Sequence, residues 1–289
     1  MPPTIQPTIT RGTWQVERDA PTEEAYAVLA ADRRWNGYSI ADLAPATRQW
    51  TRVAIAQQLG KHEHKAEAAC LFYRHPAFNS LIPHGDPAGV TAIMADAATA
   101  GLLPAETYVL AQESQITALA DHYLFPQGRR PMLRMAVDRT TFAPPAQGSA
   151  ATNRLRDADL ASLLAFYATY PDSTFTADQL THGVFYGVRE RGQIVATGGT
   201  HVVAAEYGLA AAGNIFVIPE ARGRGLGGMV TAAIVAELLA DSCHEVILNV
   251  VAANVPATRL YQRLGFTAHR AYSEARAIRR QPDTAAEQE

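Results

Sequence analysis

Two arginines and four glycines stand close together between Arg222 and Gly228, in a segment that follows an apolar run at 214–218. The apolar residues after this segment recur at helical spacing, so the expected order is strand, loop, helix. A helix N-terminus offers main-chain N–H groups without intrahelical partners and the positive end of the helix dipole. We therefore expect the loop to bind an anion, most simply a phosphate, with Arg222 and Arg224 as charge-assisted donors.

Two familiar phosphate loops do not fit this segment. Gly223, Gly225 and Gly228 match the dinucleotide fingerprint G-x-G-x-x-G, but four residues separate the first glycine from the strand, and no carboxylate follows the next expected strand, 246–250. A Walker loop would require a lysine at Met229. The segment therefore disfavours a nicotinamide-dependent oxidoreductase and a nucleoside-triphosphate enzyme.

A third loop does fit. Arg222-x-x-Gly225-x-Gly227, between a strand and a long helix, resembles the acyl-CoA pyrophosphate loop of the GCN5-related N-acetyltransferase (GNAT) family. Downstream, the stretch from Asn254 to Phe266 is similar to the family's Asn-x-x-Ala-x-x-Leu-Tyr-x-x-x-Gly-Phe segment. Two motifs in the family's order are far more specific than one. The resemblance covers about residues 152–278 and implies an enzyme that takes acetyl-CoA as acyl donor and needs no metal.

The resemblance also implies where acyl-CoA binds. In this family the strand before the loop diverges from the following strand, and the pantetheine arm hydrogen-bonds to the exposed main chain, a form of strand addition. A main-chain N–H near Val217 would face the thioester carbonyl and serve as an oxyanion hole. By position, the cofactor-binding residues are Ile215, Phe216, Val217, Arg222, Gly223, Arg224, Gly225, Leu226, Gly227, Gly228 and Asn254.

The resemblance implies a catalytic role for one residue of the second motif but does not identify the general base. Tyr261 corresponds to the tyrosine that protonates the leaving coenzyme A thiolate, although its spacing also fits a core aromatic. Several relatives use a carboxylate base on the fourth or fifth strand, where this chain has Asn214 and Asn249, and an amide cannot act as a base. His201 on the third strand is the best titratable candidate for the general base, with a sheet-face histidine as the alternative. Asn254 has an alternative role as a plain helix cap.

The order of expected elements occurs twice along the chain. Each half is expected to contain a helix, three strands, a helix, a strand, a helix and a strand. The sequence therefore predicts an α/β fold of the mixed-sheet, α+β kind, with two GNAT-like domains that are each a twisted, mostly antiparallel sheet flanked by helices. The predicted parts are a domain at 1–142, a linker at 143–151, a catalytic domain at 152–280 and a disordered tail at 281–289.

The first copy lacks the loop. It has Gly85-Asp86-Pro87-Ala88 where the second copy has Arg222 to Gly227. A carboxylate from Asp86 at the N-cap would occupy the free N–H groups and repel a phosphate. We therefore expect a degenerate first domain that no longer binds acyl-CoA, a tandem arrangement that is known within the family.

Composition excludes several classes. The net charge of −3 implies no general affinity for nucleic acid or anionic membranes. The two cysteines, with no C-x-x-C, argue against a disulfide scaffold or a cysteine zinc site, and His62 and His64 lack a further ligand cluster. No apolar run is long enough to span a bilayer, and no signal peptide is recognised, so the expected address is cytoplasmic.

These patterns predict an N-acetyltransferase that transfers an acetyl group from acetyl-CoA to a primary amine by direct attack in a ternary complex. The expected acceptor is a small-molecule or peptide amine, and the oligomeric state is not specified. The alternative is a catalytically silent acyl-CoA-binding or regulatory module, because the strand carboxylate that several relatives use is missing.

Overall fold

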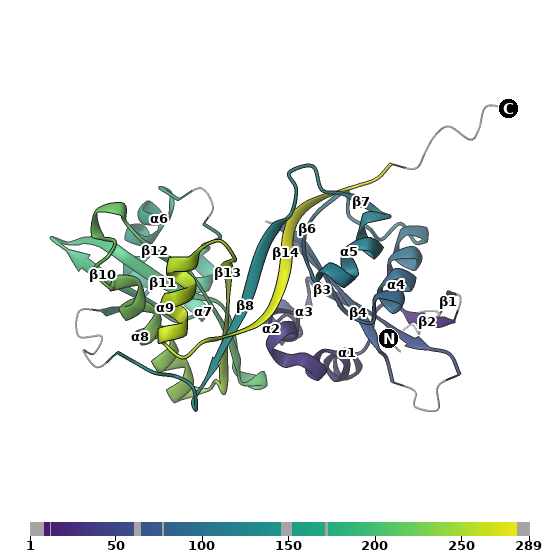
Figure 1. The fold of residues 1–289 in the computed structure, drawn as a ribbon, viewed down its shortest axis with the longest axis horizontal. Helices are drawn as coiled ribbons and strands as arrows, with labels where there is room; N and C mark the ends of the chain where they lie inside the picture. The colour runs from purple at the N-terminus through teal and green to yellow at the C-terminus, as the bar shows by residue number, and fades with distance from the viewer. Residues whose placement is uncertain are drawn as a thin grey trace. The chain divides into compact units, whose positions relative to one another are not determined.

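The computed structural model describes residues 9–11, 13–60, 65–76, 78–145, 152–170 and 173–281. The chain divides into two compact units (Figure 1). Unit 1 combines residues 1–132 with 271–289, and unit 2 comprises residues 133–270. Both units are mixed α/β, which confirms the predicted fold class: each has mostly antiparallel sheet strands, with one described parallel pair, and helices packed on them.

Unit 1 has the strand order β1-β2-β3-β4-β5-β6-β14, and the short β7 pairs with β14. Its parallel pair is β5–β6. Helix α4 packs on β2 to β5, and its buried residues include Val90, Ile93 and Met94. The elements are β1 (Ile9–Arg11), β2 (Trp14–Glu17), α1 (Thr22–Leu29), α2 (Arg33–Ala41), α3 (Pro45–Arg48), β3 (Thr51–Gln58), β4 (Ala68–His75), β5 (Phe78–Gly85), α4 (Pro87–Thr99), β6 (Glu106–Ala111), α5 (Glu113–Ala120), β7 (Tyr123–Leu124) and the 271–279 part of β14 (Thr267–Arg279).

Unit 2 has the strand order β8-β13-β12-β11-β10-β9, with β12–β13 as its parallel pair. Short 3₁₀ turns at Asp157–Asp159, Ala205–Tyr207 and Pro219–Ala221 connect some of its elements. The elements are the 133–138 part of β8 (Arg130–Asp138), β9 (Asn153–Leu155), α6 (Leu160–Tyr167), α7 (Ala177–His182), β10 (Phe185–Glu190), β11 (Gln193–Ala204), β12 (Leu209–Val217), α8 (Leu226–Asp241), β13 (Glu245–Val251) and α9 (Val255–Arg263).

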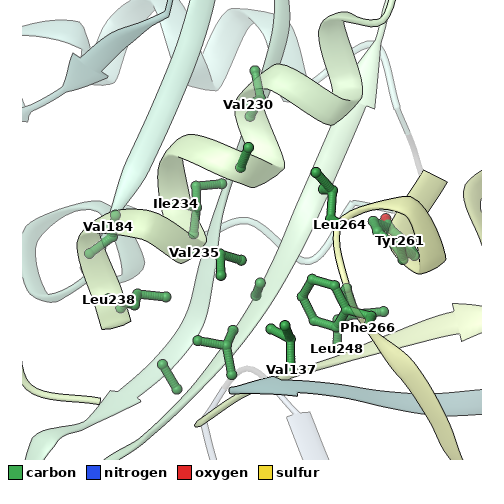
Figure 2. Close-up of a cluster of buried hydrophobic side chains, with 14 of the residues drawn as sticks. Val137, Val184, Val230, Ile234, Val235, Leu238, Leu248, Tyr261, Leu264 and Phe266 are labelled. Atoms are coloured by element: carbon green, nitrogen blue, oxygen red, sulfur yellow. The ribbon is translucent and has the colours of Figure 1, made fainter. Parts of the chain in front are cut away.

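Helix α8 is the central element of the unit 2 core. Its apolar residues lie on more than one side of the helix, and ten of its sixteen residues are buried, which fits a helix enclosed between the sheet and other elements. Figure 2 shows Val230, Ile234 and Leu238 of α8 in one cluster with Leu248 of β13 and with Tyr261 of α9. The core therefore fixes the helix that follows the glycine-arginine loop.

The unit boundaries differ from the predicted domains because each unit contains a strand from the other half of the sequence. Val137 of β8 belongs to the unit 2 core, and Ala277 of β14 belongs to the unit 1 core. In unit 1, β14 lies antiparallel to β6, with Glu274 opposite Leu110 (Figure 1). Each sheet thus takes its last strand from distant sequence, which local periodicity cannot reveal.

Other expectations differ in detail. The first helical region continues beyond residue 32 as α2, and the N-terminal part of the catalytic half contains the short strand β9 and a separate helix, α7. Most of the predicted linker, 146–151, and most of the predicted tail, 282–289, lie outside the described residues. None of the helices in the described ranges has the length and apolar character needed to cross a bilayer.

Candidate active site

The loop that leads into α8 has an open main chain. Gly223 and Gly225 have φ angles of 75° and 78°, in the left-handed region that glycine adopts without strain. A Cβ added at either position would meet no atom within 4 Å. Among the described residues, no side chain caps α8, so the first N–H groups of this helix have no side-chain acceptor. An uncapped helix start that follows a glycine-rich loop is a geometry suited to an anion.

The two loop arginines lie in different environments. Arg222 Nε donates to the main-chain oxygen of Val217 at 3.2 Å, which holds the loop against the end of β12. Arg224 forms an ion pair with Glu190 at the end of β10, and its guanidinium lowers the pKa of that carboxyl group. A phosphate contact from Arg224 would therefore require this ion pair to open.

Strand β12 separates from β13 just before the loop. The parallel pairing runs from Leu209 opposite Glu245 to Ala212 opposite Leu248 and ends there, while β12 continues to Val217. On its other edge β12 stays paired with β11 as far as Val217. Among the described strands, the stretch that includes Ile215, Phe216 and Val217 is therefore paired on one edge only, which is the geometry that strand addition by a pantetheine arm requires.

A β-bulge interrupts β12 within this stretch. Gly213 pairs with Gly199 and Phe216 pairs with Thr197, so Asn214 and Ile215 together oppose the single residue Gly198. Asn214 has a φ of 52°, one of two non-glycine residues with positive φ in the described chain. Asparagine tolerates this left-handed conformation better than most residues. Bulges redirect the main chain and are frequent beside active sites.

His201 is itself the extra residue of a second bulge. Thr200 pairs with Ala212 and Val202 with Ala211, which leaves His201 without an opposite residue on β12. Its imidazole lies against Gly213, because a Cβ added there would be 1.9 Å from Nε2. The structure therefore places the predicted base candidate directly beside the Asn214 bulge. Asn249, by contrast, accepts a hydrogen bond from the buried Arg134 at 2.6 Å.

Helix α9 contains the two residues of the second motif. Asn254 Oδ1 accepts from the Ala257 N–H at 3.2 Å, so the helix-cap role expected as its alternative is observed. Tyr261 is 8% exposed, and its ring centroid lies 5.8 Å from that of Phe266 (Figure 2). Burial raises the pKa of Tyr261 to about 12. The phenol therefore stays protonated at neutral pH.

One contact ties the strand, the loop helix and α9 together. A Cβ added at Gly227 would lie 3.5 Å from Val217 Cγ2 and 3.6 Å from Leu260 Cδ1. These are ordinary van der Waals distances, so the end of β12, the first turn of α8 and the middle of α9 meet at this point. The predicted residues of the two motifs are thus brought to one region of unit 2.

The corresponding region of unit 1 is built differently. Asp86 Oδ1 accepts from the N–H groups of Ala88 at 2.8 Å and Gly89 at 3.2 Å, which is the expected carboxylate cap on α4. Strand β5 pairs with β4 without a register shift, so it has no bulge. Gln115 of α5 donates to the Gly85 carbonyl at 3.1 Å and ties α5 to the end of β5.

Sequence reasoning did not identify Tyr167 and Gln179 as residues of this site. Both contact Asn214, through its carbonyl oxygen and its side-chain amide respectively. Both residues precede the loop by more than forty positions, and no motif marks them. In the described ranges no group of three or more histidine, cysteine, aspartate or glutamate side chains could hold a metal ion, and His62 and His64 lie outside those ranges.

Comparison with known proteins places these features in context. The profile described as the Acetyltransferase (GNAT) family matches residues 153–266. A mycothiol acetyltransferase of an Arthrobacter species is 39% identical over 88 residues, which cover 29% of this chain and 27% of that protein. A mycothiol acetyltransferase of Streptomyces griseus is 34% identical over 149 residues, which cover 50% of this chain and 42% of that protein. The chain thus matches less than half the length of either relative.

Solved structures share the fold over both units. A GCN5-related N-acetyltransferase from Sphaerobacter thermophilus aligns with a TM-score of 0.60 at 18% identity, covering 95% of this chain and 99% of that chain. At this identity the likeness concerns the fold alone. It extends beyond residues 153–266 to the architecture of unit 1.

Proposed function

Because residues 153–266 belong to the acetyltransferase (GNAT) family, we propose that the chain transfers an acetyl group from acetyl-CoA to the primary amine of a small molecule. The observation that carries the proposal is the combination of an uncapped glycine-rich helix start with the free edge of β12 beside it. The first can hold a pyrophosphate and the second a pantetheine arm. The two mycothiol acetyltransferases among its relatives support a small-molecule acceptor.

In the proposed reaction the acceptor amine attacks the thioester carbonyl carbon directly in a ternary complex. The C–N bond forms, the carbonyl oxygen gains negative charge, and the C–S bond then breaks to release coenzyme A. The main-chain N–H groups of Ile215 and Val217 would donate to the developing oxyanion, because the alternating hydrogen bonds of the ladder direct the N–H of Phe216 toward β11. An amine with a pKa near 10 is mostly protonated at neutral pH, so a base must take a proton, and His201 beside the bulge is our candidate.

Tyr261 is proposed to act on the leaving group. With a pKa raised to about 12 by burial, its phenol is a weaker acid than a thiol of pKa about 8.5, so complete proton transfer to the sulfur is uphill. A hydrogen bond from the phenol to the departing thiolate needs no transfer and still lowers the charge on sulfur. This role fits a tyrosine that stays protonated across the neutral range.

We propose one acyl-CoA site per chain, in unit 2. The Asp86 cap, the regular β5 and the Gln115 bond in unit 1 support this view, since each removes a feature that unit 2 presents to the cofactor. The buried free thiols Cys70 and Cys243 fit the cytoplasmic address proposed for the reaction.

The test uses the full chain and a matched pair of loop variants. Gly228 lies in the first turn of α8, and a Cβ there would meet only Leu260 at 3.8 Å, so both Gly228→Ala and Gly228→Asp should fold. A carboxylate in the first turn suits the helix dipole but repels a pyrophosphate. Saturating acetyl-CoA at about 100 times its Kd should stabilise the wild type and Gly228→Ala by about 2.7 kcal/mol, and Gly228→Asp far less.

Thiol release in the presence of a panel of amines, including mycothiol-related ones, then tests turnover. Equal stabilisation of Gly228→Asp and Gly228→Ala would contradict the loop assignment, and no stabilisation of the wild type would contradict acyl-CoA binding altogether. Stabilisation without turnover on any amine would favour the silent acyl-CoA-binding module instead.

A further inference from the structure

Side chains from outside β12 form hydrogen bonds with Asn214, the bulge residue with positive φ. Tyr167, at the end of α6, donates from its hydroxyl to the Asn214 carbonyl oxygen at 2.6 Å, and this bond is buried. The Asn214 side-chain amide donates to Gln179 Oε1 at 2.9 Å, and Thr174 Oγ1 donates to Asn214 Oδ1 at 3.4 Å. The main chain and the side chain of the bulge residue are thus both bound.

The carbonyl contact has a directional consequence. A peptide unit is planar and trans, so the carbonyl oxygen of Asn214 and the N–H of Ile215 point in opposite directions within one plane. The Tyr167 hydroxyl fixes the oxygen on the α6 side of the strand. The N–H of Ile215 is therefore fixed to point away from α6, and the strand enters 216–217 in one defined orientation.

We propose that Tyr167 is a positioning residue for acyl transfer, which acts through the Asn214 carbonyl to aim the main-chain N–H groups of Ile215 and Val217 at the thioester oxygen. This inference rests on the proposed function. It assigns a role to the hydroxyl group specifically, apart from the packing of the ring. Gln179 and Thr174 assist by holding the asparagine side chain, so that the left-handed conformation at 214 persists.

The surroundings of Tyr167 suit this role. The side chain is 5% exposed, and burial raises its pKa, against a smaller lowering by the Thr197 hydroxyl, so the phenol stays a donor. Its ring stacks on Phe175 at 4.6 Å and meets Phe216 edge-on at 5.8 Å. Removing the oxygen alone leaves these ring contacts in place. The hydroxyl can therefore be tested separately from the packing.

Tyr170 supplies a matched control. It lies one turn further along the chain, and its ring also packs on Phe216, with centroids 4.7 Å apart. Within the described residues its hydroxyl forms no hydrogen bond, unlike that of Tyr167. Tyr167→Phe and Tyr170→Phe thus remove the same atom from neighbouring tyrosines, and only the first removes a contact to the bulge.

The experiment measures kcat, the KM for acetyl-CoA, the melting temperature and the infrared carbonyl band of bound acetyl-CoA labelled with ¹³C at the thioester carbon. Loss of one oxyanion-hole donor costs about 10²- to 10³-fold in kcat, so a misaimed donor should cost about 10- to 100-fold. We expect this fall for Tyr167→Phe, with KM changed less than about threefold and the carbonyl band moved toward that of free acetyl-CoA. Tyr170→Phe should match the wild type in all four measurements.

A Tyr167→Phe protein with a lower melting temperature but wild-type kcat and an unshifted carbonyl band would overturn the proposal, because a merely structural role predicts that result. Asn214→Gly provides a second variant, since glycine adopts the same φ and keeps the carbonyl for Tyr167. It should retain the carbonyl band that Tyr167→Phe loses. Failure of the proposed function shows separately, as a wild type that neither binds acetyl-CoA nor releases thiol.

Discussion

His201, the proposed base, packs against Gly213. A substitution at Gly213 can therefore move the imidazole while the histidine itself stays unchanged. Gly213 has an ordinary φ, so alanine fits its backbone, but the added Cβ would lie 1.9 Å from His201 Nε2 and 2.2 Å from Cδ2. The ring must retreat to at least 3.4 Å for ordinary contact, a movement of about 1.5 Å. Gly213→Ala therefore tests the position of the imidazole.

The expected magnitude follows from this displacement. A catalytic group misplaced by about 1 Å can cost about 10²-fold in rate, and a general base contributes about 10²- to 10⁴-fold. We expect Gly213→Ala to lower kcat by about 100-fold, with little change in the affinity for acetyl-CoA. The crowded strand should also lose about 1–3 kcal/mol of unfolding free energy.

Two comparisons isolate the effect of the histidine. Gly187→Ala crowds β10 in a similar way, with the added Cβ 2.9 Å from Leu155 Cδ1, but it lies away from His201 and should lower stability while kcat is kept. A double-mutant cycle then combines Gly213→Ala with His201→Ala. If the glycine change acts by moving the imidazole, it should have little further effect on kcat once the imidazole is gone.

The assay is steady-state thiol release with the best acceptor, at several pH values, alongside thermal unfolding of each variant. His201→Ala with wild-type kcat would refute the base assignment. Additive losses in the double variant would show that Gly213→Ala acts on the strand and not through the histidine.

Three further predictions concern single groups. Tyr261→Phe should lower kcat about 10- to 100-fold while acetyl-CoA still binds, since only the donor to sulfur is lost; an unchanged kcat in the thiol-release assay would count against it. Burial raises the pKa of Asp42 from 3.8 to about 7, so the folded state keeps a proton that the unfolded state releases. Stability should therefore fall by about 3 kcal/mol as pH rises from about 4 to about 7, and Asp42→Asn should abolish that slope in thermal melts. Gly265→Ala should destabilise at least about 2 kcal/mol more than Gly192→Ala in denaturant unfolding, because φ is positive at both but only the first Cβ meets a main-chain oxygen, that of Thr141, at 1.8 Å; equal losses would contradict this.

The backbone turns of the candidate site could be predicted from sequence because their causes are local. The backbone is left-handed at Gly223 and Gly225, and this conformation favours glycine. The glycines in the sequence therefore indicate the turn directly. The Gly-Phe end of the second motif has a similar local cause, since Gly265 has a φ of 91° and passes close to the Thr141 carbonyl. Each of these backbone constraints requires glycine, so the sequence alone reveals where they occur.

The bulges could not be predicted in this way. A bulge is a mismatch between two strands, so the positions of His201 and Asn214 depend on how β11 and β12 pair along their whole length. The role of Tyr167 depends in turn on that pairing and on where α6 packs. The ion pair between Arg224 and Glu190 likewise joins residues on separate elements. Such facts require the three-dimensional register, which periodicity does not provide.

The 271–279 part of β14 belongs to unit 1 but follows unit 2 in the sequence, so the sheet of unit 1 can be completed only late in synthesis on the ribosome. Translation proceeds from the N-terminus, at about 5–20 residues per second, so the strand that completes the sheet of unit 1 emerges only after all of unit 2. Until then the edge of β6 that pairs with β14 is exposed, and an exposed strand edge can mispair with other chains. A nascent chain that stops after Phe266 would contain both motifs of the candidate site, yet the sheet of unit 1 would still lack β14.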